Sequence, residues 1–222
     1  GTVFGAEKEF LAAPRLDDLE CVFAAAKAFL AGENRENVTV LSLFDNEETG
    51  SLTRQGADSP FLSEVLERIS LSCGKSREEH LRAIASGFML SADNAHAVHP
   101  DSPEKSDPTN RCYLNEGVVV KHSPRYASDA LTAGVFQAIC QKAGVPVQVY
   151  YNNSRIPGGG TLGNLSGSHV ALPTVDIGLP QLSMHSPYET AGAKDLEYMV
   201  QAMEAFYKTV LTVTGQDAYE IS

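Results

Sequence analysis

Hydrophobic and polar positions along the chain form blocks, and the most apolar block predicts a buried strand. Residues 38–44 read Val-Thr-Val-Leu-Ser-Leu-Phe, a β-branched and largely apolar run that is typical of a strand covered on both faces of a parallel sheet. Glu47 and Glu48 follow this run, and Gly50 marks a turn. Because ligands of open α/β sheets gather beyond the carboxyl ends of such strands, we take this junction as a candidate active site.

The other blocks predict strands and helices in alternation. Expected strands lie at residues 9–13, 87–92, 117–121, 145–151 and 174–179. Expected helices lie at residues 19–30, 61–72, 128–143 and 189–214, with a short helix that opens at Ser76 and has capping-box spacing to Glu79. This alternation predicts an α/β fold with three αβα layers around a mainly parallel (mixed) sheet. No internal repeat or linker divides residues 1–222, so we expect one domain or most of one.

Composition and charge narrow the class of protein. Hydrophobic residues make up 43% of the chain, which excludes a disordered protein. The formal net charge of -11 argues against a nucleic-acid partner, because such a surface needs clustered Lys and Arg. The chain lacks an apolar run of the roughly 18 residues that a membrane-spanning helix needs. Its first residues lack the basic and apolar regions of a signal peptide.

The cysteines indicate the compartment. All four lie far apart in the sequence and form no CxxC pair, so they are expected to be reduced and mostly buried thiols of a cytoplasmic protein: Cys21, Cys73, Cys112 and Cys140. The chain opens at Gly1 without an initiator methionine. We therefore expect it to be a piece of a longer polypeptide.

Four places put metal-competent side chains at expected strand ends or tight turns: Asp17, the pair Glu47 and Glu48, Asp93 and His185. Carboxylates with one histidine suit Zn²⁺, Mn²⁺ or Co²⁺. One glutamate of the pair is able to hold a metal while the other stays free to move a proton. Each position also has a structural alternative. Asp17 is a good N-cap for the following helix, Asp93 suits an Asx-turn, and a single histidine is more often a hydrogen-bonded structural residue.

Other polar and glycine residues are candidates for binding the substrate. His96 lies three residues after Asp93, where a role in supporting a metal ligand or in contacting substrate is favoured over a separate metal site with His99. Lys121 ends a valine-rich strand in an acidic protein and is a candidate for binding a substrate carboxylate, with a surface lysine as the alternative. The loop that contains Gly159 and Gly160 lacks the Lys-Ser/Thr ending of a P-loop. It suits close backbone approach to an extended substrate or a simple tight turn.

Five sequence blocks, spread over nearly the whole chain, resemble the M18 family of metalloaminopeptidases. The family includes the aspartyl aminopeptidases and the vacuolar aminopeptidase I type. The matching blocks are Ala-Pro-Arg-Leu-Asp-Asp at 13–18, Phe-Asp-Asn-Glu-Glu-Thr-Gly-Ser at 44–51, Ser-Ala-Asp-Asn-Ala-His-Ala-Val-His-Pro at 91–100, Arg-Tyr-Ala at 125–127 and Pro-Gln-Leu-Ser-Met-His-Ser at 180–186. The resemblance implies a zinc-exopeptidase-like fold and an exopeptidase with two zinc ions, or two manganese or cobalt ions.

Residue roles follow from this resemblance. Asp17 would bridge the two ions, Glu48 and His185 would complete the ligands of one ion, and Asp93 would bind the other. Glu47 would be the general base that takes a proton from water and later returns it to the leaving amine. In aspartate-preferring members a lysine at the position of Lys121 helps to hold the acidic side chain of the substrate, and His96 matches a position near it. Intact members assemble as dodecamers.

Two departures from the family pattern limit this reading. The family's fifth metal ligand is a histidine near the N-terminus, and an inserted dimerisation domain separates it from the Asp17 block; neither is in this chain. The chain would then be the C-terminal part of one catalytic domain. The second departure is Pro187-Tyr188 before Glu189, where relatives carry Ile-Arg, which bears on substrate preference. We therefore expect an aminopeptidase acting on peptides, including those with acidic N-terminal residues. The alternative is a catalytically silent assembly module; a phosphohydrolase would need a basic phosphate clamp that is missing.

Overall fold

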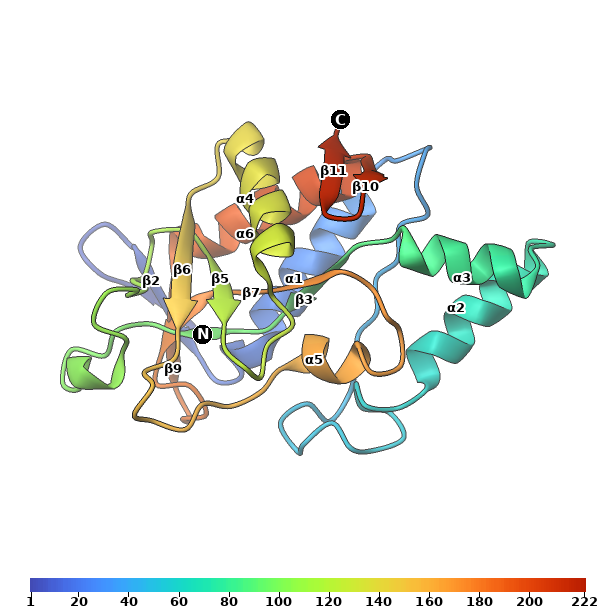
Figure 1. Ribbon diagram of the computed structural model, residues 1–222. Helices are drawn as coiled ribbons and strands as arrows, with labels where there is room; N and C mark the ends of the chain where they lie inside the picture. Colours follow the sequence, from blue (N-terminus) through green and yellow to red (C-terminus); the bar gives the residue numbers. More distant parts are fainter.

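The computed structural model describes residues 1–222 and has a mixed α/β fold (Figure 1). Its helices are α1 (Leu16–Ala31), α2 (Phe61–Ser72), α3 (Arg77–Ala85), α4 (Ala130–Ala143), α5 (Leu162–Ser166) and α6 (Ala193–Lys208), with a 3-10 turn η1 (Pro103–Lys105). Its strands are β1 (Thr2–Phe4), β2 (Phe10–Ala13), β3 (Met89–Ala92), β4 (Ala95–His96), β5 (Val118–His122), β6 (Val147–Tyr151), β7 (Thr174–Gly178), β8 (Pro180–Leu182), β9 (Glu189–Gly192), β10 (Leu211–Gly215) and β11 (Ala218–Ile221).

The strands form two main sheets and a terminal hairpin. The first sheet has the order β3-β7-β5-β6, and the second has the order β1-β2-β9-β8-β4. The hairpin pairs β10 with β11. In the first sheet β3 pairs with β7 and β5 pairs with β6 in parallel, while β5 and β7 are antiparallel. The second sheet is antiparallel except for the β4–β8 pair. The expected mixed sheet is therefore present, but its antiparallel share is larger than the alternation of elements predicts.

One face of the first sheet carries the main core. Helices α1, α4 and α6 cover this face, and their small side chains let the helices approach it closely; Ala24, Ala28 and Ala202 are fully buried. Val118 and Val120 of β5 point to the same side. The opposite face carries the short helix α5, whose Gly163 lies against Ser91 of β3 and Asp176 of β7. The prediction of three layers is thus confirmed, with three helices on one face of the sheet and only the short helix α5 on the other.

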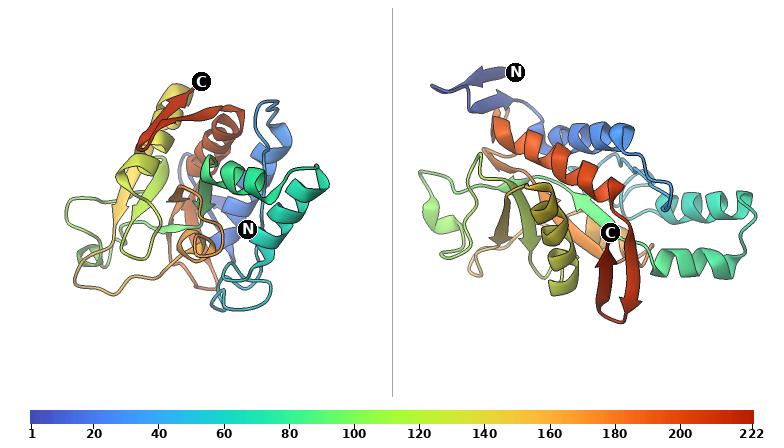
Figure 2. Two further views of the ribbon diagram at one scale, coloured as in Figure 1. Left: turned by 45° about the vertical axis from the view of Figure 1, so that its right-hand side comes forward. Right: turned by 90° about the horizontal axis from the view of Figure 1, so that it is seen from above.

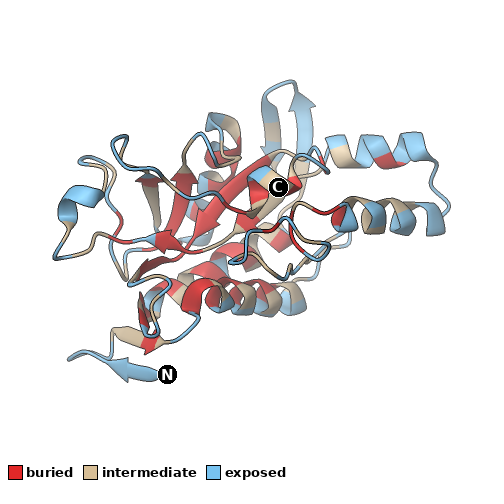
Figure 3. Cartoon of the chain, turned by 90° about the horizontal axis from the view of Figure 1, so that it is seen from below, coloured by how far each residue is buried: buried red, intermediate tan, exposed pale blue.

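Local sequence signals explain where the helices start and stop. The Ser76–Glu79 capping box expected at the start of α3 is formed. Helix α4 begins with a second capping box, between Asp129 and Thr132, and ends at Gly144 in the left-handed conformation. The paired helices α2 and α3 project from the body, as the turned views show (Figure 2). Their outer surfaces and strand β1 are mostly exposed, whereas β7 and β5, the two central strands of the first sheet, are buried (Figure 3).

The prediction of a buried strand over residues 38–44 is wrong for this chain. No backbone–backbone hydrogen bond involves these residues. Leu41 packs on the core, but Val38 is 86% and Leu43 is 52% exposed. A strand needs a neighbouring strand for its N–H and C=O groups, and no segment of the chain lies in that position. The apolar pattern of residues 38–44 is therefore a poor indicator of both strand pairing and burial in this chain.

The expected long helix at 189–214 is also wrong at both ends. Residues Glu189–Gly192 form strand β9, because they pair with β2 and β8, and Leu211–Gly215 form β10. The structure agrees with the reading of the cysteines as free thiols, since three are buried and only Cys73 is exposed. None of the helices has both the length and the apolar character that a bilayer crossing requires.

Candidate metal centre

Three side chains from distant parts of the sequence converge on one point. The Nε2 atom of His185 lies 3.3 Å from Oδ2 of Asp17 and 3.0 Å from Oε2 of Glu48. Ligand-competent atoms of Asp17, Glu48 and His185 all lie within 4.8 Å of one another. Asp17 is buried, while Glu48 and His185 are exposed, so the cluster has a buried floor and an open rim.

A second cluster shares Asp17 with the first. Carboxylate oxygens of Asp17, Asp18 and Asp93 also lie within 4.8 Å of one another. The Oδ1 atoms of Asp17 and Asp18 are buried and accept no hydrogen bond. Buried carboxylate oxygens without a donor are costly unless a cation balances them. The structure therefore brings together the four expected ligands, Asp17, Glu48, Asp93 and His185, and adds Asp18.

Tight turns aim these side chains. Asp17 follows β2 through Arg15, which has a left-handed φ of 60°. The alternative that Asp17 caps the helix is not seen, because its Oδ1 accepts no hydrogen bond and its Oδ2 lies beside His185. His185 itself has a φ of 66°. Asn46, just before Glu47, is also left-handed, with a φ of 63°. Such backbone is costly for non-glycine residues and clusters at functional sites.

The end of β3 carries Asp93, and the neighbouring strand leaves room for it. A Cβ atom at Gly178 of β7 would lie 2.2 Å from the carbonyl oxygen of Asp93. Only glycine allows this close approach of the two backbones. Glu47 and Glu48 lie in a turn closed by the N–H of Gly50, which donates to the carbonyl oxygens of Asn46 and Glu47.

The carboxylates raise one another's pKa. Burial, Asp93 and Glu48 raise the pKa of Asp17 to about 9. Burial and Asp93 also raise the pKa of Asp18 well above its usual value. Burial, Asp93 and Glu48 raise the pKa of Glu47 to about 7. A group of acids held this close favours either protons or a divalent cation.

The donor set fits divalent cations of intermediate hardness. It offers several carboxylates and one imidazole, which is a combination that Zn²⁺, Mn²⁺ and Co²⁺ accept. The shared Asp17 carboxylate has one oxygen near His185 and a second, buried oxygen without a partner. A carboxylate in that position is able to contact two ions at once.

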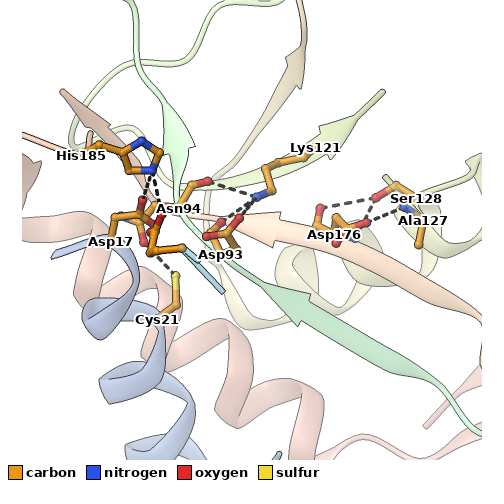
Figure 4. A network of polar contacts seen from close by, with 10 residues as sticks. Asp17, Cys21, Asp93, Asn94, Lys121, Ala127, Ser128, Asp176 and His185 are labelled. Atoms are coloured by element: carbon orange, nitrogen blue, oxygen red, sulfur yellow. Dashed lines mark hydrogen bonds and ion pairs between the residues drawn. The ribbon is translucent and has the colours of Figure 1, made fainter. Parts of the chain in front are cut away.

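Lys121 is buried behind Asp93 (Figure 4). Its Nζ donates to the carbonyl oxygen of Asp93 at 2.9 Å, to Oδ2 of Asp93 at 3.2 Å and to the carbonyl oxygen of Asn94 at 3.1 Å. Burial opposes its charge, but the negative charges of Asp93, Tyr126 and Asp176 together outweigh that effect, and the pKa of Lys121 is raised. All three donors are engaged within the chain, so a contact with a substrate carboxylate requires Lys121 to exchange one of them.

Asp176 links the same region to the loop after β5 (Figure 4). It is fully buried on β7, and its Oδ2 accepts the N–H of Ala127 at 2.5 Å. The N–H of Asp176 donates to Oγ of Ser128 at 2.8 Å. The loop held in this way carries Tyr126, whose ring centroid lies 5.3 Å from Nζ of Lys121.

Several polar residues of the centre were not expected. They are Asp18, Glu189, and the buried group in which Asn94 donates to Glu20 and accepts a weak hydrogen bond from Cys21. Burial raises the pKa of Glu20 to about 8. The adjacency of Asp17 and Asp18 was the one signal for Asp18. Glu20 lies in the helical pattern and gave no signal, because a carboxylate on a helix is usually at the surface.

Of the expected substrate-contacting residues, His96 and Lys121 lie near Asp93, and the two glycines lie in a loop. His96 on β4 is open to solvent, and partial desolvation of its ring by the surrounding protein, with the charges of His185 and Lys121 nearby, lowers its pKa. Gly159 and Gly160 lie in an exposed loop between β6 and α5, with open space around the position of a Cβ atom. No hydrogen bond joins these glycines to the acidic cluster, although Arg125 donates to the neighbouring carbonyl of Gly158 at 3.0 Å.

Comparison of the sequence with known proteins finds a matching family and related proteins. Residues 1–207 match a family profile described as aminopeptidase I zinc metalloprotease (M18). The chain is 46% identical over 209 residues to a probable M18 family aminopeptidase 2 of Clostridium acetobutylicum, covering 93% of this chain and 48% of that protein. It is 43% identical over 211 residues to the protein of the same description from Mycobacterium leprae, covering 94% and 50%. The chain thus spans about half the length of the curated relatives it matches.

Solved structures share the fold. A crystal structure of prApe1 superposes with a TM-score of 0.86 at 34% identity, covering 93% of this chain and 45% of that chain. A structure of the S. cerevisiae mApe1 dodecamer gives a TM-score of 0.80 at 33% identity, covering 93% and 47%. An M18 family aminopeptidase from Thermotoga maritima gives a TM-score of 0.85 at 24% identity, covering 93% and 48%. These similarities confirm the α/β fold that was expected.

Proposed function

The chain belongs to the aminopeptidase I zinc metalloprotease (M18) family, and from this membership we propose that the intact protein is an aminopeptidase that removes N-terminal residues from peptides with two bound divalent ions, zinc above all. The observation that carries the proposal is the position of Asp17. Its carboxylate belongs to both clusters, with Glu48 and His185 on one side and Asp18 and Asp93 on the other. A shared carboxylate between two ligand groups is the arrangement that a two-metal hydrolase needs.

Glu47 is the proton carrier in this proposal. When bound, divalent ions polarise the scissile carbonyl and make water more acidic. Glu47 lies in the same turn as Glu48, is half-buried, and has a pKa raised to about 7 by burial and by Asp93 and Glu48. A carboxyl group with a pKa near the working pH takes a proton from the attacking water and returns it to the leaving amine. Glu48, exposed beside His185, serves as a ligand instead.

Substrate recognition is assigned to the rim of the site. The centre is open on the side of Glu48, His185 and His96, all exposed, so a peptide N-terminus reaches it from there. Lys121 provides the positive charge next to Asp93, which supports acidic residues among the substrates. Gly159 and Gly160 offer unobstructed backbone for an extended substrate.

The assembly and the cellular location are proposed from two separate observations. We propose a homo-oligomer, because one of the similar solved structures is the S. cerevisiae mApe1 dodecamer. The free thiols support a cytoplasmic location.

The proposal is tested on the intact protein with aminoacyl p-nitroanilides that carry aspartate, glutamate, leucine or alanine. We expect hydrolysis that EDTA abolishes and that Zn²⁺, Mn²⁺ or Co²⁺ restores, with N-acetylated substrates left intact. Hydrolysis that survives complete removal of metal, or cleavage of acetylated substrates at equal rates, would contradict it. A preference for aspartate over leucine would establish the acidic specificity.

The second candidate is an assembly module without catalysis. The observation in its favour is the exposure of apolar side chains on α1 and the segment after it, such as Leu30 at 85% and Val38 at 86%. Such surfaces are typical of protein contacts. An intact protein that binds one ion tightly and hydrolyses none of the substrates would support this candidate.

A further inference from the structure

Glu189 lies where two ligand-bearing turns meet. It is the first residue of β9, and β9 lies between β2 and β8 in the second sheet. Asp17 follows the end of β2, and His185 follows the end of β8. Glu189 is opposite Ala13, the last residue of β2, in the β2–β9 register. Its side chain therefore starts midway between the two turns.

The carboxylate of Glu189 holds both turns directly. One oxygen, Oε2, accepts the backbone N–H of Asp17 at 3.0 Å. The other, Oε1, accepts the backbone N–H of His185 at 2.7 Å. The residue is 2% exposed, so water does not compete for these oxygens. Asp17 and His185 are 168 positions apart in sequence, and one side chain spans the backbones of both.

We propose that Glu189 is a positioning residue that fixes the spacing between Asp17 and His185 for a shared metal ion. This inference rests on the proposed function, since it assumes that the two side chains bind metal. The left-handed backbone of His185 and of Arg15 makes each turn costly to hold. A charged acceptor offsets that cost, because hydrogen bonds to an ionised group are stronger than neutral ones.

The chemistry of the contact requires a carboxylate rather than any polar group of the same size. A carboxylate accepts at both oxygens. A glutamine amide accepts at one end only, and its NH₂ group would face a backbone N–H at the other end. Glu189→Gln therefore removes one of the two anchors without changing the volume of the side chain.

The test compares Glu189→Gln with wild type and with Glu78→Gln, a matched control on the exposed surface of α3, all in the intact protein. Three quantities are measured: zinc affinity by competition with a chromophoric chelator, the visible absorption spectrum of the Co²⁺-loaded protein, and the rise in melting temperature on adding zinc. We expect Glu189→Gln to lose zinc affinity by roughly 10- to 100-fold, to change the Co²⁺ spectrum and to show a smaller zinc-induced rise. Glu78→Gln is expected to match wild type.

The outcomes separate positioning from mere stabilisation. Glu189→Gln with wild-type zinc affinity and Co²⁺ spectrum would overturn the proposal, even if its melting temperature fell equally with and without zinc. If that variant does not fold, Glu189→Asp decides with the same readouts, because it keeps both acceptors one methylene too short. It is expected to weaken zinc binding, and unchanged binding would overturn the proposal. A wild-type protein that takes up no zinc would instead overturn the proposed function and this inference with it.

Discussion

Asp17 concentrates the electrostatic cost of the site in one carboxyl group. Burial and the neighbouring carboxylates Asp93 and Glu48 all disfavour its ionised form. Without cations, a proton is the simplest way to reduce that repulsion. Two further buried acids have pKa values raised by burial, Glu20 to about 8 and Asp195 to about 6. The metal-free chain therefore holds protons that the unfolded chain releases.

This excess of protons predicts how stability depends on pH. The pKa of Asp17 is about 9 in the folded state against 3.8 as the ordinary value, so its contribution is complete at acidic pH and is lost as pH rises through the folded pKa. We expect the melting temperature in EDTA to fall between about pH 5 and pH 9. Zinc is expected to reverse the fall, because the cation replaces the proton. A metal-free melting temperature that rises over this window would contradict the assignment.

Replacing Glu47 and replacing Glu48 with glutamine are expected to have different effects on zinc binding and on turnover. Glu47→Gln removes the proposed proton carrier and leaves the proposed ligands in place, so we expect zinc binding to persist while kcat falls by about 10²- to 10⁴-fold. Glu48→Gln removes a proposed ligand beside His185, so we expect weaker zinc binding. Zinc titration and hydrolysis of an aminoacyl p-nitroanilide on both variants make the comparison. Equal loss of zinc by the two variants would remove the distinction.

At the residue level, Asp17, Glu48, Asp93 and His185 each have a structural alternative when taken singly, and the order of five sequence blocks is what groups them. The structure places Asp17 near the other three, with Glu48 and His185 in one cluster and Asp93 in the other, and their binding of metal stays a prediction. Glu189 was missed because its carboxylate acts on backbone N–H groups, and only the order of strands in the sheet brings those groups near it.

At the level of elements, patterns that depend on local contacts were predicted well. Helix α2 spans the expected residues, and the capping box of α3 is formed as expected. Patterns that depend on distant partners were predicted poorly. Residues 38–44 lack a neighbouring strand, and Glu189–Gly192 gain two. Hydrophobic periodicity reports on a segment's own faces, whereas pairing is decided by what the rest of the chain places beside it.

The contact between Asp176 and the loop after β5 is expected to contribute to the stability of the fold. Asp176→Ala leaves the N–H of Ala127 without its acceptor, so we expect a loss of about 1–3 kcal/mol in the free energy of unfolding. Asp176→Asn keeps an acceptor and is expected to lose less. Urea denaturation of both variants measures the difference. Equal losses would show that the buried charge matters more than the hydrogen bond.

At the scale of the whole molecule, a net negative charge is combined with exposed apolar side chains. Seven large apolar side chains that lie between residues 19 and 52 are more than a third exposed: Leu19, Phe23, Leu30, Val38, Val40, Leu43 and Leu52. The formal net charge of -11 favours separate molecules. Exposed apolar side chains in the same stretch of the chain favour association.

When these 222 residues are produced alone, we expect attraction between the exposed apolar side chains to outweigh charge repulsion, so that the molecules associate. Sedimentation velocity should show association that increases with protein concentration, and the double variant Val38→Lys with Leu43→Lys should reduce it. The exposed pair Val3→Lys with Phe4→Lys on β1 is the matched control and should have a smaller effect. A monomer at all concentrations would contradict the expectation.

The central claim is that one carboxylate, Asp17, serves two metal ions. The most direct measurement is the number of zinc ions bound per chain by the intact protein, in wild type and in the variants Asp17→Asn, Asp93→Asn and His185→Ala. We predict two ions in wild type, a loss of tight binding at both positions in Asp17→Asn, and one remaining ion in each of the other two variants. A wild-type protein with a single ion, or an Asp17→Asn variant that keeps both, would contradict the claim.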